Sequence, residues 1–181
     1  MALGPGESTM RLIPQKERIL TKFRISIVAV AVVALTAVTA AAALAAAPKK
    51  VPFTGKYSGT ATTKVTGTTA AISASGTGKA TTIGGGSISG LGAGDTSQQP
   101  CIPFTGTGKM TGSGGTITFK VLTGSSSCGD EGGHNFTITS HLAVLSATGK
   151  LAKAKGTLRM IGTYSHDDGS FSVSISGTLT K

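Results

Sequence analysis

Two different patterns of hydrophobic residues meet near residue 47 of this chain. Residues 25–47 form an uncharged run that is dense in Ile, Val and Leu as far as Leu35 and mostly Ala from Thr36 onward. After Phe53, apolar residues alternate with Thr, Ser and Gly in short runs, which is the period of β-strands. No window there has helical periodicity, and frequent glycine disfavours long helices. The pattern predicts an apolar N-terminal segment followed by an all-β domain.

Alternation predicts about eight strands between Phe53 and the C-terminal residues. The clearest is the last, in which Phe171, Val173, Ile175 and Leu179 alternate with Ser and Thr. Gly, Ser, Asp and Pro clusters mark the connections between strands. Turns or loops are expected at residues 84–86, 92–100, 113–115, 124–133 and 168–169.

Short, evenly spaced strands are typical of an antiparallel β-barrel or a β-sandwich. Several glycines fall on the predicted inward faces: Gly59, Gly106, Gly108 and Gly177. Inward glycine permits strong strand coiling and close packing in a narrow barrel, so we favour a single barrel, with a sandwich as the alternative. The predicted organisation is a basic N-terminal region at 1–24, the apolar segment at 25–47 and a barrel domain at 48–181.

The apolar segment has the features of an export signal. Five cationic residues precede it, and small residues fill its C-terminal half. At 23 residues it is also long enough to cross a bilayer, so a cleaved signal peptide and an uncleaved membrane anchor both stay open. The cleavage region is expected at Ala43, Ala45, Ala46 and Ala47, with the cut after Ala45 because Pro48 fits poorly after a scissile bond. Met1 and Met10 are both candidate starts.

Cysteine usage fits an exported domain. The two cysteines, Cys101 and Cys128, both follow the apolar segment and lie in loop-like sequences. An even number of cysteines in an oxidising compartment predicts one disulfide bond. The predicted location is secreted or in the cell envelope, with membrane anchoring by an uncleaved N-terminal helix as the alternative.

The predicted barrel domain is basic. Residues 48–181 contain 12 Lys and Arg residues against 5 Asp and Glu residues, a difference of +7. We interpret the lysines as scattered, solvated residues on strand faces; the alternative is attraction to an anionic envelope polymer. A basic stripe with interleaved aromatic residues is missing from the sequence, so nucleic-acid binding is not expected. A membrane contact is expected only through residues 25–47, if they are uncleaved.

Residues with candidate chemistry are few. The densest group of metal-ligand types runs from Cys128 to His134, but one glycine-rich loop rarely supplies three or four converging ligands, so we expect a polar loop there. The acid–base types at 166–169 are expected to form a hairpin turn. His134, His141 and His166 are the candidate metal ligands or bases. The chain has no nucleophile elbow and no complete phosphate-binding loop, so no catalytic residue, metal or cofactor is predicted.

Two groups of short phrases carry a resemblance to known proteins. The first is Ser75–Thr81, Ile83-Gly84 and Ser87–Gly90; the second is Phe136–Thr139, Ala147–Leu151 and Ala154–Leu158. They resemble segments of small secreted bacterial barrels that are similar to the allene oxide cyclase and dirigent proteins. The resemblance covers most of residues 53–181 and implies an eight-stranded antiparallel barrel. No catalytic residue of the plant barrels falls on a position of this chain, so it implies a fold and not an activity.

The functional prediction is an exported, non-catalytic barrel with a binding or structural role. The alternative is an enzyme or carrier of the allene oxide cyclase and dirigent type, with a small apolar ligand inside the barrel. In that case the aromatic residues are candidates to line the ligand, although each is also a candidate core residue. These are Phe104, Phe119, Phe136, Tyr164 and Phe171.

Overall fold

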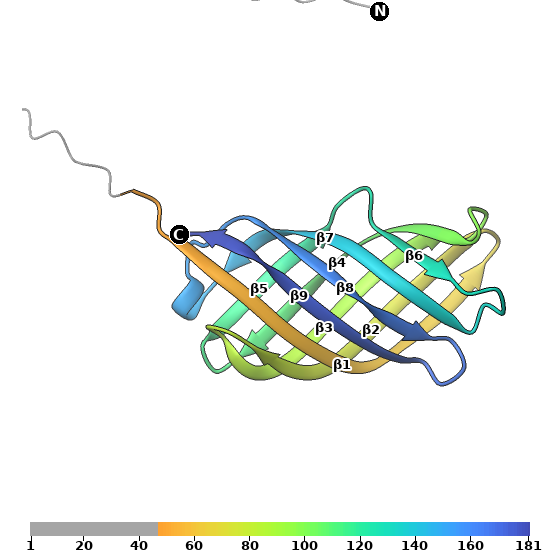
Figure 1. The fold of residues 1–181 in the computed structure, drawn as a ribbon, viewed down its shortest axis with the longest axis horizontal. Coiled ribbons are helices and arrows are strands. Elements are labelled where there is room, and N and C mark those ends of the chain that lie inside the picture. Colours follow the sequence, from red (N-terminus) through yellow and green to blue (C-terminus); the bar gives the residue numbers. More distant parts are fainter. Residues whose placement is uncertain (1–46) are drawn as a thin grey trace, which may run out of the picture. The chain divides into compact units, whose positions relative to one another are not determined.

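The alternating residues after the apolar segment wind into a closed antiparallel β-barrel (Figure 1). The computed structural model describes residues 47–181, so residues 25–46 of the predicted export segment, with Ala43, Ala45 and Ala46, lie outside the described residues. The strands are β1 Lys50–Thr66, β2 Thr69–Ala80, β3 Gly84–Asp95, β4 Cys101–Gly112, β5 Gly115–Val121, β6 Ser126–Gly129, β7 Asn135–Ala147, β8 Thr157–Ser165 and β9 Ser170–Thr180. A short 3-10 turn, η1, spans Gly149–Leu151. Within residues 47–181, no helix is long and apolar enough to cross a membrane.

The barrel closes because β9 pairs with β1 along its whole length, from Lys50 opposite Thr180 to Thr60 opposite Ser170. Strands β5 and β6 share one position between β4 and β7, so nine strands fill eight positions. This confirms the predicted single barrel of about eight strands, and the sandwich alternative is wrong. The buried core residues lie between Phe53 and Leu179, and residues 48–181 therefore contain the pairing and packing on which the fold depends.

Three predicted connections are wrong in their bounds. Residues 84–86 begin β3 rather than forming a turn, β3 continues to Asp95 inside the predicted 92–100 loop, and β6 lies inside the predicted 124–133 loop. Some of the glycines there, such as Gly86 and Gly92, reflect close packing rather than chain reversal. A Cβ on Gly86 would lie 1.8 Å from the carbonyl oxygen of Thr111 on β4. Such a glycine marks a strand approached closely by its neighbour.

Inward glycines also make room for large side chains on the adjacent strand. A Cβ on Gly108 would lie 2.5 Å from the Phe119 ring, and one on Gly78 would lie 2.6 Å from the Tyr57 ring. Each ring therefore lies over a glycine, as close packing in a narrow barrel requires. The large residues would not fit inside the closed barrel if these glycines carried side chains.

The two ends of the barrel are built differently. We call the end that holds the start of β1, the finish of β9 and the connections 81–83, 113–114 and 148–156 the closed end. There Ile83, Leu151 and Ala154, all from connections between strands, are buried against the core. The Lys150 N–H donates to the Gly114 carbonyl, which ties two of these connections together. The connections 67–68, 96–100, 130–134 and 166–169 surround the other end, which we call the open end.

A buried serine stabilises the break between β5 and β6. Ser125 is 1% exposed, and its hydroxyl donates to the Leu122 carbonyl at 2.7 Å. The same oxygen lies 3.1 Å from the hydroxyl of buried Ser140 and accepts the His141 backbone N–H at 3.2 Å. Ser125 thus forms hydrogen bonds with the Leu122 carbonyl and the His141 N–H. If β5 and β6 were one continuous strand, backbone groups of that strand would pair with β7 instead.

We predict that Ser125→Ala lowers the free energy of unfolding by about 1–3 kcal/mol, because it leaves buried polar groups of β7 without a partner. The measurement is urea unfolding under oxidising conditions. The control is Ser174→Ala on the exposed face of β9, which should change stability by less than about 0.5 kcal/mol. Equal effects of the two substitutions would contradict this role for Ser125.

Candidate functional site

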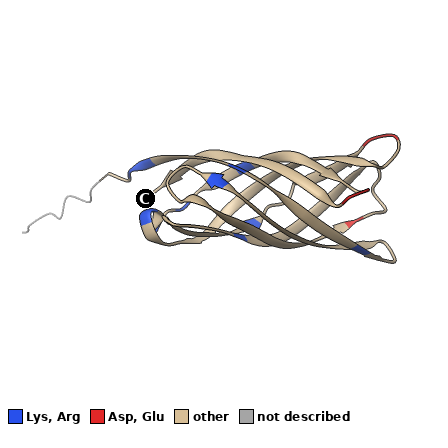
Figure 2. Ribbon diagram, turned by 90° about the horizontal axis from the view of Figure 1, so that it is seen from below, with Lys and Arg blue, Asp and Glu red and all other residues tan. Residues whose placement is uncertain are grey.

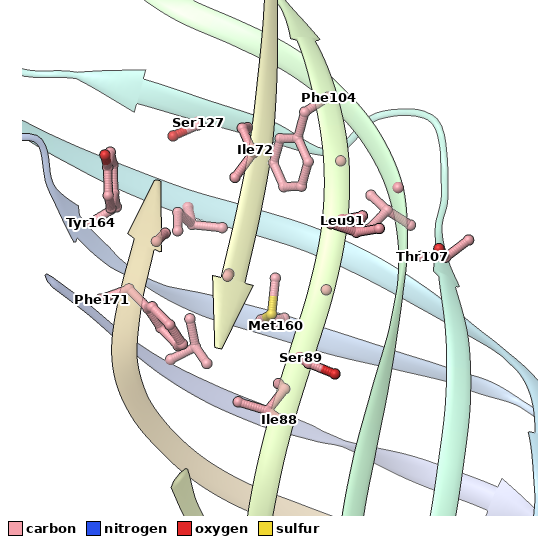
Figure 3. Close-up of a pocket in the computed structure, with 18 of the residues that line it drawn as sticks. Ile72, Ile88, Ser89, Leu91, Phe104, Thr107, Ser127, Met160, Tyr164 and Phe171 are labelled. Atoms are coloured by element: carbon pink, nitrogen blue, oxygen red, sulfur yellow. The ribbon is translucent and has the colours of Figure 1, made fainter. Parts of the chain in front are cut away.

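An apolar cavity of about 170 Å³ lies inside the barrel toward the open end. Every strand contributes to its wall, and Figure 3 shows Ile72, Phe104, Phe171 and Ile88 around it. The side chains that face it are mostly aliphatic or aromatic. They are Ala61, Thr63, Ile72, Ala74, Ile88, Phe104, Phe119, Val121, Ser127, Ile138, Met160, Tyr164, Phe171 and Val173.

The cavity exists because small residues occupy inward positions on one side of the barrel. On β2, β3 and β4, the inward positions at this level include Ala74, Gly90, Gly92 and Gly106. At the closed end, large side chains such as Phe53 and Met110 fill the corresponding space and are fully buried. Ser89, Leu91 and Thr107 also border the cavity, but alternation places them on the outward face, where each is exposed.

Polar groups along the cavity wall are few. The Thr63 and Tyr164 hydroxyls lie 3.5 Å apart, and Ser127 adds a further hydroxyl. Closer to the closed end along β1, the buried Tyr57 hydroxyl has no hydrogen-bond partner among the described residues, and burial raises the pKa of that hydroxyl. The cavity therefore offers an apolar interior with hydroxyl groups on β1, β6 and β8.

Four of the five aromatic residues named from the sequence border this cavity: Phe104, Phe119, Tyr164 and Phe171. Phe136 is not part of the wall. Its ring packs against Tyr164 instead, with centroids 6.1 Å apart, and it covers Gly129 of β6. Sequence reasoning missed the aliphatic and small members, such as Ile72, Met160 and Gly90. Strand alternation indicates which residues of a strand face inward. Only the register between neighbouring strands shows which inward residues lie at the same height along the barrel axis.

The predicted disulfide between Cys101 and Cys128 is confirmed. These residues are direct partners in the ladder between β4 and β6, and they face outward because the neighbouring Ser127 faces the cavity. The disulfide joins the four-residue β6 to the start of β4 beside the open end. A disulfide is also compatible with an extracellular or envelope location.

The three histidines do not form a common site. His134 Nδ1 lies 2.8 Å from the Asp167 carboxylate, which links the 130–134 loop to the 166–169 turn, and both side chains are more than 60% exposed. His141 faces outward on β7 opposite Arg159, and His166 lies in the turn. Among residues 47–181, no three His, Cys, Asp or Glu side chains are grouped closely enough to hold a metal ion.

Carboxylates near the open end stabilise the loops locally. Asp130 accepts hydrogen bonds from the backbone and side chain of Asn135, which hold the pKa of this carboxyl below its usual value. Asp168 accepts the Ser170 backbone N–H at 2.9 Å, which likewise lowers its pKa. The expected turn at 166–169 is present between β8 and β9. Figure 2 shows the acidic residues toward this end, whereas basic residues lie at the other end and also along the wall.

The fold and cavity together define a class of protein, an antiparallel β-barrel with an apolar internal cavity in one half of the barrel. No protein-family model matches the chain, and neither a curated protein nor a solved structure matches it. The resemblance to allene oxide cyclase and dirigent barrels therefore stays a prediction.

We predict that replacing Cys101 and Cys128 by Ser lowers the free energy of unfolding. The disulfide closes a 27-residue loop, worth about 3.5 kcal/mol in the chain-entropy model. Urea unfolding of the double variant against the oxidised protein measures the difference. A loss below about 1 kcal/mol would show that the ladder between β4 and β6 fixes this loop without the bond.

We predict that His134 titrates above the ordinary value for histidine. The hydrogen bond that the His134 ring donates to Asp167, and the negative charge of that carboxylate, raise the pKa of His134. The link between the loops is therefore strongest below the ordinary pKa of histidine and is lost as pH rises through the raised one. NMR titration of the ring protons measures this pKa. Asp167→Asn should return it toward the ordinary value, whereas Asp168→Asn should not. A similar shift in both variants would contradict the assignment.

Proposed function

We propose that this protein is an exported, non-catalytic barrel that binds a small apolar ligand in the cavity near its open end. The observation that supports this most directly is an apolar space of about 170 Å³ with a wall drawn from every strand. Well-packed protein interiors have few voids larger than a water molecule. A cavity lined by apolar side chains and about this large binds a benzene-sized molecule in other proteins.

The size of the cavity limits the ligand. By comparison with known cavities, a space of about 170 Å³ suits a single ring or a short acyl chain. Burial of about 200 Å² of apolar ligand surface contributes about 5 kcal/mol before the cost of association. The expected affinity is therefore modest, and a hydroxyl or carbonyl on the ligand would pair with the hydroxyls of Thr63 and Tyr164.

Charge near the open end favours neutral or cationic ligands. Asp95, Asp130, Glu131, Asp167 and Asp168 all lie in or beside its connections. A region lined by one sign of charge lowers the local concentration of ligands with the same sign. An acyl chain that ends in an amine or alcohol should therefore bind better than the carboxylate of equal length.

Export is supported by the sequence and by the chemistry of the described domain. The basic flank, apolar run and small residues before residue 48 match a secretory signal, and the disulfide suits an oxidising compartment. An enzyme acting on the same ligand is the second candidate. In such an enzyme the His134–Asp167 pair would serve as the acid–base group, because it is the one acid–base contact beside the open end among the described residues. His134→Ala should leave ligand binding unchanged if the protein is a carrier.

We predict that Ala74→Leu weakens binding of benzene and indole at least tenfold, because the larger side chain fills part of the cavity. Ligand-detected NMR and ligand-induced thermal stabilisation measure the affinity. The matched control is Ala71→Leu, since Ala71 lies on the same strand but faces solvent. Unchanged binding in the Ala74 variant, or equal loss in both variants, would place the ligand elsewhere and contradict the proposal.

A further inference from the structure

Half of the cationic residues that follow the apolar segment gather at the closed end of the barrel. Lys49 and Lys181 exchange two backbone hydrogen bonds of 2.9 Å, and the Lys181 ammonium donates to the Lys150 carbonyl at 3.0 Å. Lys155 pairs with Thr180 in the same region. The fold thus brings together lysines from three separated parts of the sequence. The six exposed residues are Lys49, Lys50, Lys150, Lys153, Lys155 and Lys181.

Carboxylates do not balance these lysines. The five acidic residues of the described chain all lie in or beside connections of the open end. Among the described residues, the ion pair found joins His134 to Asp167, and no lysine lies within ion-pair distance of an acidic side chain. Figure 2 shows the acidic residues toward the open end, and basic residues both at the closed end and along the barrel wall. The interpretation of the lysines as scattered along strand faces is therefore wrong for half of the cationic residues.

Two more lysines extend this positive surface along the barrel wall. Lys56 and Lys79 are direct partners across β1 and β2, and both are exposed. Like charges that face each other across a ladder destabilise the strand pair. Repulsion within the whole cluster also opposes folding, and an anionic partner would offset it.

The chemistry and placement of the cluster favour a membrane surface as that partner. Lys49 follows the apolar run at 25–47 by two residues, so the chain enters the barrel at the lysine-rich end. Basic residues directly after a membrane-active segment are attracted to anionic headgroups, by about 1 kcal/mol for each residue near the surface. Ile83 and Leu151 fill the closed end, so the lysines surround a plugged face rather than a pocket for a small anion.

We propose that the lysine-rich closed end of the barrel docks on an anionic bilayer surface, which leaves the open end facing away from the membrane. The cluster is formed by residues 49–181 alone, so docking is available to the cleaved protein as well as to an anchored one. It does not depend on whether the cavity binds a ligand.

The test uses the barrel of residues 48–181, which contains its own core and closed sheet, so that the apolar segment cannot bind the vesicles. Partitioning is measured by co-sedimentation with phosphatidylcholine vesicles that contain or lack phosphatidylglycerol. We expect binding only to the anionic vesicles and its loss at high ionic strength. K150Q/K153Q/K155Q should weaken partitioning about a hundredfold.

The matched control is K64Q/K109Q/K120Q, which removes the same charge from the barrel wall. It should weaken partitioning by less than about tenfold, because Lys64 lies near the open end and Lys109 and Lys120 lie on the barrel wall outside the cluster. Circular dichroism confirms that both triple variants are folded. Equal loss in the two variants, or no preference of the wild-type barrel for anionic vesicles, would overturn the proposal. Tight binding of soluble polyphosphate without binding to vesicles would also overturn it in favour of a polymer.

Orientation is read from single tryptophan reporters, since the chain has no Trp of its own. Ser113→Trp places the reporter in an exposed turn of the closed end, and Thr68→Trp places it in an exposed turn of the open end. A spin label on the lipid headgroup should quench the first reporter and not the second. Stronger quenching at position 68 would reverse the orientation and contradict the proposal.

Discussion

Closure of eight strand positions into one barrel fixes the interior volume, and the size of each inward side chain decides how that volume is filled. At the closed end, Phe53, Met110 and Leu179 are fully buried, and rings such as Tyr57 lie over glycines that could not carry a side chain. Toward the open end the same closed ladder continues, but alanine and glycine occupy inward positions on three adjacent strands. The hydrogen-bonded strands keep the width of the barrel constant. The cavity therefore forms where the inward side chains are too small to fill that width.

The same unequal filling gives the barrel two ends with different chemistry. One end is plugged by apolar residues from its connections and surrounded by lysines. The other end lies nearer the cavity and carries the acidic residues. The lysine cluster at one end and the acidic residues at the other give the domain an electric dipole along the barrel axis. A membrane at the first end and a ligand at the second would occupy separate surfaces, so the two proposed contacts do not compete.

Alternation in the sequence was sufficient to predict the all-β class and the inward face of β9, and the inward glycines favoured the single barrel. The even number of cysteines and their place after the apolar segment were sufficient to predict the disulfide bond. Glycine-rich positions were misread, because Gly86 and Gly92 resemble turn residues in sequence while in space they allow two backbones to approach closely. Composition alone does not separate these two reasons for glycine.

The candidate site was harder to predict because it depends on register. Four aromatic residues of the cavity wall could be named from the sequence, yet Phe136 lies outside it, and the aliphatic wall depends on which inward residues of eight strand positions share a level. The contact between His134 and Asp167 joins residues 33 positions apart, and no local pattern indicates it. The lysine cluster likewise forms only when both ends of the domain meet the connection between β7 and β8.

The central claim is that the space among Ile72, Phe104 and Phe171 is an apolar cavity able to hold a ligand. A crystal structure of the barrel under xenon pressure tests it most directly, because xenon enters dry apolar cavities and is visible by its scattering. The account predicts a xenon atom within the barrel, in contact with these three side chains. A barrel without interior xenon, in which the lining side chains have collapsed to fill the space, would contradict it.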